Sequence, residues 1–76
     1  MTYDLHRASE MVLALMQLGL HEGTRTWKGY DWSVLDDLFE RGLISDPKSK
    51  AKSVVLTAEG MVQSKVMAAK YLGAAV

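Results

Sequence analysis

Apolar residues recur along the chain with a period close to that of an α-helix. Between residues 4 and 20 they spread over roughly 220° of a helix circumference, at about 100° per residue. A surface helix needs an apolar stripe only about half as wide. We therefore predict a first helix over residues 4–20 that packs on two sides, either as the central helix of the domain or as a helix shared with a second subunit.

Two further helices are predicted from caps and periodicity. The second begins at Asp31, which suits an N-cap, and ends before Gly42, which suits the left-handed position after a helix. The last runs over residues 58–72 after the N-cap Thr57, and the tail 73–76 is expected to fray. The second helix has an apolar face of Trp32, Leu35, Leu38 and Phe39, opposite an acidic face of Asp36, Asp37 and Glu40. The last helix has an apolar stripe of Met61, Val62, Val66, Ala69 and Leu72.

Three short segments between the helices have β-forming character. Residues 24–30 carry threonine and aromatic side chains between glycines, so a short strand or extended loop is expected there. Residues 43–44 and 53–56 are apolar runs on either side of the polar stretch 45–52. Because Asp46-Pro47 opens a turn, we predict a β-hairpin with a polar, lysine-bearing loop.

This order of elements predicts an α+β fold, a reduced winged-helix-like domain: helix, short strand, helix, β-hairpin wing, C-terminal helix. Residues 38–44 (LFERGLI) resemble the end of a recognition helix that enters the wing in winged-helix regulators. Residues 55–60 (VLTAEG) resemble the second wing strand and the helix after it. The helix that normally precedes the recognition helix is missing, because residues 22–30 take its place.

A closer resemblance covers most of the chain. Residues 27–32 (WKGYDW), 42–47 (GLISDP) and 50–57 (KAKSVVLT) are similar to a family of short bacterial proteins known only as a domain of unknown function. The resemblance implies a bacterial source and a winged-helix-like fold. It implies no activity.

Size and composition predict self-association. The chain has 76 residues, enough for one domain over residues 1–76, and 49% of them are hydrophobic. So small a body cannot bury that much apolar surface alone, so we expect a homodimer. The 9 basic and 9 acidic residues balance, and this neutrality gives no sign of an acidic partner.

The sequence also bears on cysteine chemistry and on the location of the protein. It contains no cysteine, which excludes disulfides, thiolate metal sites and cysteine nucleophiles. The N-terminal residues lack the features of a signal peptide, and the longest apolar run, residues 11–16, is too short to span a bilayer. We expect a cytoplasmic protein without membrane association.

No pattern in the chain indicates catalysis. His6 and His21 lie fifteen residues apart, near opposite ends of the first helix, and so cannot share a small site. The carboxylates of the second helix are interpreted as a solvated acidic face. No phosphate-binding glycine loop, nucleophile elbow or zinc-protease motif is present. We expect no catalytic, cofactor or metal site, and no enzyme.

Two functional hypotheses follow. The first is a protein-interaction or assembly domain whose dimer seam contains Met11, Leu15, Leu18, Val66, Met67 and Ala69. The second is an auxiliary DNA-binding or regulatory protein that contacts the phosphate backbone weakly, through Arg25, Lys28, Lys48, Lys50 and Lys52. Lysines in such a loop also protect an exposed strand edge from aggregation, which is the competing interpretation.

The aromatic residues around residue 30 leave alternatives open. Trp27 and Tyr30 are candidate contacts for a protein partner or for nucleic-acid bases, and they are equally candidates for the core. For Trp32 we expect the core, because it shares a helix face with Leu35 and Phe39. The acidic residues of the second helix would repel phosphates if that helix entered a major groove.

Overall fold

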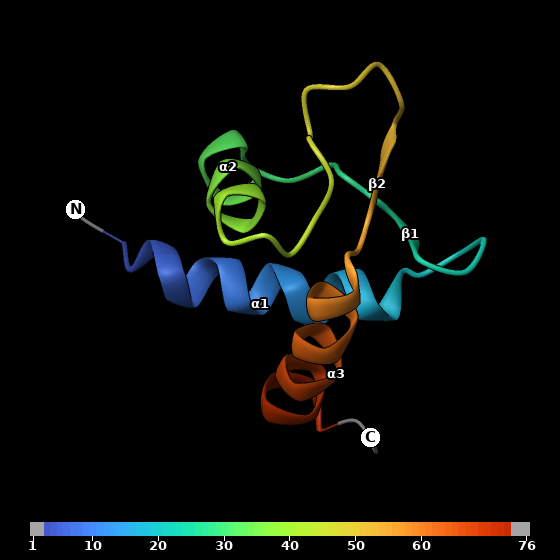
Figure 1. The fold of residues 1–76 in the computed structure, drawn as a ribbon. Coiled ribbons are helices and arrows are strands. Elements are labelled where there is room, and N and C mark those ends of the chain that lie inside the picture. Colours follow the sequence, from blue (N-terminus) through green and yellow to red (C-terminus); the bar gives the residue numbers. More distant parts are fainter. Residues whose placement is uncertain (1–2, 74–76) are drawn as a thin grey trace.

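The computed structural model describes residues 3–73, which form three helices and two short strands (Figure 1). The elements in chain order are α1 (Leu5–Leu18), β1 (Arg25–Trp27), α2 (Trp32–Glu40), β2 (Ser53–Val55) and α3 (Ala58–Leu72). This order confirms the α+β prediction and is compatible with a reduced winged-helix-like arrangement. The predicted fraying of residues 74–76 lies outside the described part of the chain.

Each helix begins at a side chain that accepts a hydrogen bond from a free backbone N–H. Asp4 accepts from the Arg7 N–H at 3.1 Å, so it caps α1 rather than forming its first turn. Asp31 caps α2, and the Thr57 hydroxyl accepts from the Gly60 N–H at 2.9 Å at the start of α3. The two N-caps predicted at Asp31 and Thr57 are therefore confirmed.

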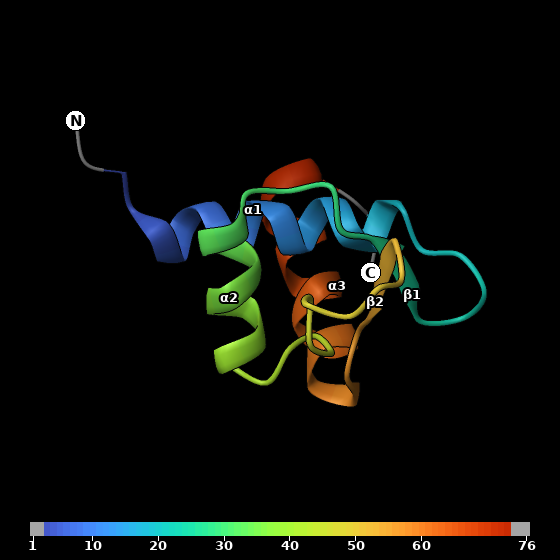
Figure 2. The same cartoon turned by 90° about the horizontal axis from the view of Figure 1, so that it is seen from above.

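Helix α1 is the central helix, and α2 and α3 pack against different sides of it (Figures 1 and 2). Its buried residues Leu13, Ala14 and Met16 are at most 2% exposed. This confirms the two-sided packing predicted from the wide apolar face of the helix. The hydrophobic core lies between α1, α2 and the sheet and contains Leu13, Met16, Val34, Leu35, Leu38, Leu43, Ile44, Val54 and Leu56.

A tight turn after α1 sends the chain back along the helix. The backbones of His21 and Arg25 exchange two hydrogen bonds of 2.8 and 3.1 Å. Between them Glu22 and Gly23 both have positive φ angles, 49° and 85°. The Thr26 hydroxyl then donates to the Met16 carbonyl at 3.0 Å, which ties β1 to the last turn of α1.

The strands pair differently from the prediction. β2 pairs antiparallel with β1, with Thr26 opposite Val54. The expected hairpin between residues 43–44 and 53–56 is reduced to one bridge, between Ile44 and Leu56. Beyond that bridge the turn at Pro47 carries the chain away, and proline offers no backbone N–H for a ladder. Residues 45–52 therefore form a loop rather than a regular wing.

Two predicted helix faces are also wrong in detail. Val34, Leu35 and Leu38 form the buried side of α2, which leaves Trp32 55% and Phe39 43% exposed, so Trp32 is not a core residue. The buried side of α3 consists of the small residues Gly60, Ser64 and Ala68. In α3 the small residues allow close contact with the neighbouring backbone, and the larger Val62, Val66 and Leu72 are left exposed.

Candidate functional site

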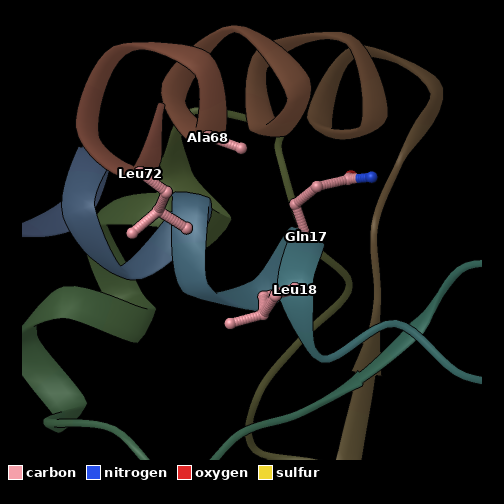
Figure 3. A pocket seen from close by; sticks show the side chains of 4 residues that line it. All are labelled: Gln17, Leu18, Ala68 and Leu72. Carbon is pink, nitrogen blue, oxygen red and sulfur yellow. The ribbon is translucent and has the colours of Figure 1, made fainter. Parts of the chain in front are cut away.

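A groove between α1 and α3 forms an apolar concave surface. It has a volume of about 500 Å³ and is lined by Gln17 and Leu18 of α1 and by Ala68 and Leu72 of α3. Figure 3 shows these four side chains around the space between the two helices. Leu18 is 76% exposed, unusual for so large an apolar side chain. We call this surface the α1–α3 groove.

Polar contacts fix the two helices that form the groove. The Ser64 hydroxyl donates to the side-chain amide oxygen (Oε1) of Gln17 at 2.7 Å. A second contact lies seven residues before Gln17 in α1 and seven residues after Ser64 in α3. There the Tyr71 hydroxyl donates to Glu10 at 2.8 Å, and the Lys70 ammonium lies 3.6 Å from the same carboxylate. The Tyr71 hydrogen bond lowers the pKa of Glu10 against the opposing effect of burial, and the charge of Lys70 lowers it further. The groove thus lies between two crossing helices whose contact is fixed by polar bonds at two points (Figures 1 and 2).

The predicted dimer seam is divided by the fold. Met11, Leu15 and Leu18 are exposed at helical spacing on one side of α1, beside the groove. On α3, Val66 is also exposed. It lies two residues from each of the buried residues Ser64 and Ala68, which places it on the opposite side of the helix, away from α1. Met67 packs against the core and Ala69 is half-buried. The structure therefore brings together the α1 half of the seam, adds Leu72 to it, and separates Val66.

The predicted basic residues gather around the sheet. Arg25 donates to the Ser53 hydroxyl across the strand pair at 3.1 Å. The Lys28 ammonium donates to the carbonyls of Pro47 and Ser49, both at 2.7 Å. These bonds hold the loop that carries the exposed residues Lys48, Lys50 and Lys52 next to β1. We call residues 21–28 and 45–55 the sheet end.

The balanced net charge conceals a separation of charge along α1. The sheet end contains five cationic and two acidic residues, a formal charge of +3. Residues 31–41, which include α2, contain four acidic residues and one arginine, a formal charge of −3. In Figure 1, α2 lies over the N-terminal half of α1 and the sheet over its C-terminal half. Neutral composition therefore does not exclude an acidic partner, because the two charges lie at different ends of the molecule.

The carboxylates of α2 are less exposed than expected. Asp36 and Asp37 are half-buried, whereas Glu40 is exposed as predicted, and Asp37 lies against His6 near the start of α1. Asp37 accepts from Arg41 at 3.2 Å and lies 3.7 Å from His6. Within residues 3–73 no group of three or more histidine or acidic side chains is placed to hold a metal ion. These contacts give Asp37 a structural role between two helices.

The two aromatic residues Trp27 and Tyr30 differ in their burial. Trp27 is 57% exposed and stacks on His21, with ring centroids 4.4 Å apart. Tyr30 is half-buried against the core, and this burial raises the pKa of its hydroxyl. The tight turn after α1, which brings His21 against Trp27, has no signal in the sequence beyond Gly23.

A family model described as a domain of unknown function, DUF6429, matches residues 4–74. The chain belongs to the DUF6429 family. The uncharacterized protein y4hR of Sinorhizobium fredii is 50% identical to it over 64 residues, which cover 84% of this chain and 86% of that protein. The resemblance to a family of short bacterial proteins of unknown function is therefore confirmed, and neither name refers to catalysis.

No solved structure matches the chain. Among the described residues of this DUF6429 chain, no helix is both long and apolar enough to cross a membrane.

Proposed function

We propose that this DUF6429 protein is a non-enzymatic assembly domain that forms a homodimer through the α1–α3 groove and the exposed side of α1. The observation that carries this function is the exposure of Met11, Leu15 and Leu18 beside the groove, by 48%, 41% and 76%. Scattered apolar residues are normal on a surface, but three in a row beside an apolar groove form a patch. Burying such a patch is the main driving force of protein association.

A second copy of the chain is the occupant that fits this surface. A standard interface buries about 800 Å² on each partner, about a sixth of the 4927 Å² that this chain exposes. With a two-fold axis perpendicular to α1, the two α1 helices run antiparallel, so the Asp4 end of one faces the Leu18 end of the other. Lys65 lies at that second end, next to Ser64, which bonds Gln17. Exposed Asp4 and Lys65 would then form complementary charges at the rim.

Two matched substitutions test the dimer. Met11→Asp and Leu18→Asp are expected to convert a dimer into a monomer in analytical ultracentrifugation, because each places a charge in the apolar seam. Val66→Asp is the control: Val66 and Met11 are both 48% exposed, but Val66 points away from α1. A wild-type chain that stays monomeric at high micromolar concentration, or a Leu18→Asp variant that still dimerises, would overturn the proposal. Circular dichroism checks that each variant is folded.

A second function, weak binding to a nucleic-acid backbone, is supported by the +3 charge of the sheet end. Lys48, Lys50 and Lys52 are exposed, and none of them is in an ion pair within the described residues. Clustered cations of this kind bind phosphates in a strongly salt-dependent way. The double charge reversal Lys50→Glu, Lys52→Glu is expected to abolish low-salt binding to a labelled duplex. Unchanged affinity in that variant would reject the loop as the contact.

A further inference from the structure

The outward face of the β1–β2 pair carries a large aromatic side chain, Trp27, that is not part of the hydrophobic core. Successive strand residues point to opposite faces. Thr26 and Val54 are 1% exposed and face α1, so Arg25 and Trp27 face outward together with the opposite residue Ser53. The indole of Trp27 is 57% exposed. A large aromatic side chain thus lies partly open to solvent on a short sheet.

Local contacts hold this indole in place. His21 stacks on it with ring planes 27° apart, and the backbone of His21 is bonded to that of Arg25. The guanidinium of Arg25 is fixed on the same face by its bond to Ser53. An exposed aromatic ring in a fixed orientation binds a planar ligand with little loss of conformational entropy. The arrangement therefore favours stacking.

Cationic residues also flank this platform, and one of them, Arg25, has its guanidinium 3.9 Å from the Glu22 carboxylate. The Lys28 backbone N–H donates to the Lys52 carbonyl at 3.3 Å, which continues the strand pair beyond Trp27 toward the loop. The Lys28 ammonium holds the loop itself through Pro47 and Ser49. A stacking surface beside a track of positive charge is the combination that proteins use for unpaired nucleic-acid strands. A duplex would offer the charge but not the base faces, because those are stacked within the helix.

We infer that the outward face of the β1–β2 pair is a binding platform for single-stranded nucleic acid, with a base stacked on Trp27 and phosphates bound by Arg25 and the loop lysines. This inference rests on the second proposed function and deepens it. It is independent of the α1–α3 groove, which lies along a different pair of elements. The ligand class is a flexible polyanion with accessible bases, either DNA or RNA.

The test is fluorescence anisotropy with labelled oligothymidine, oligouridine and a duplex of equal length, at low and at physiological salt. The single strands are expected to bind more tightly than the duplex. Trp27→Ala should weaken single-strand binding about tenfold, as expected for one stacked base, and leave duplex binding unchanged. Trp27→Phe should restore most of the loss. Lys50→Glu, Lys52→Glu should reduce the salt slope, which for single strands is about −0.7 per neutralised phosphate.

Trp32→Ala is the matched control. Trp32 is 55% exposed, nearly the same as Trp27, but it lies on α2 in the acidic part of the chain, so its loss should not change affinity. Equal loss in Trp27→Ala and Trp32→Ala, or no loss in Trp27→Ala, would overturn the stacking platform. If Trp27→Ala caused no loss and duplex binding fell only in the lysine double variant, the backbone-binding function would stand and the stacking platform would be rejected. Absence of all binding at low salt would reject both.

Discussion

Gly60 of α3 lies directly against the carbonyl group of Leu43. A Cβ atom on residue 60 would stand 1.9 Å from the Leu43 oxygen and 2.9 Å from its carbonyl carbon, closer than real atoms approach. The same oxygen accepts the Thr57 N–H at 3.1 Å, and the Thr57 hydroxyl donates to the Gly42 carbonyl at 2.7 Å. The first turn of α3 is therefore fixed to the segment that follows α2, and this contact sets where α3 leaves the sheet.

This contact predicts the effect of Gly60→Ala. Alanine is the better helix former by about 1 kcal/mol, but the overlap with backbone atoms forces α3 to move, which costs about 1–3 kcal/mol or more. We expect a net loss of stability in urea denaturation. Gly29→Ala is the control, because no atom lies within 4 Å of a Cβ there and its φ is not positive. A Gly60→Ala variant more stable than the wild type would show that α3 is free to shift.

Two buried serines predict opposite responses to alanine. Ser9 of α1 is fully buried and its hydroxyl has no hydrogen-bond partner, whereas the buried Ser64 hydroxyl bonds both Gln17 and the Met61 carbonyl. Ser9→Ala removes an unsatisfied polar group and should stabilise the fold by about 1 kcal/mol. Ser64→Ala leaves Gln17 without that partner and should destabilise it by about 1 kcal/mol. Thermal melting of both variants checks the contrast, which equal shifts would contradict.

The Glu10 carboxylate predicts a loss of stability in acid. Its pKa is lowered from an ordinary value of 4.5, first by the Tyr71 hydroxyl and also by Lys70. A group with a depressed folded-state pKa stabilises the fold above its ordinary pKa, and this contribution is lost as the pH falls through the lower folded value. Tyr71→Phe should therefore be less stable than the wild type at neutral pH, and the gap should narrow below 4.5. A gap that is constant with pH in urea titrations would contradict this.

The Lys28 ammonium predicts the order of the loop. It donates to two loop carbonyls, at Pro47 and Ser49, and few other contacts hold residues 48–52. Lys28→Met keeps most of the aliphatic chain but removes both bonds. We expect faster amide hydrogen exchange at residues 48–52 and unchanged exchange in α1. Lys65→Met, which removes an exposed lysine of α3, should leave loop exchange unchanged, and loss of protection in both variants would contradict the assigned role.

Part of the candidate site could be predicted from the sequence, and part could not. The loop lysines could be named as one group because they lie close together in sequence. Arg25 and Lys28 were predicted to join this group, but what brings them to the loop is the pairing of β1 with β2, two segments separated by a whole helix. The exposure of Trp32, and the separation of Val66 from Met11, followed from helix rotations that apolar periodicity alone does not fix.

The sequence by itself determined the three helices, the caps at Asp31 and Thr57, and the two-sided packing of α1, because caps and apolar periodicity act over a few neighbouring residues. The tertiary structure alone decided which strands pair, which side of α3 is buried and where the opposite charges gather. The physical reason is that these features depend on close contacts between distant segments. Gly60 against Leu43 and Thr26 against Met16 are such contacts, since each concerns a backbone carbonyl that the residue pattern does not locate.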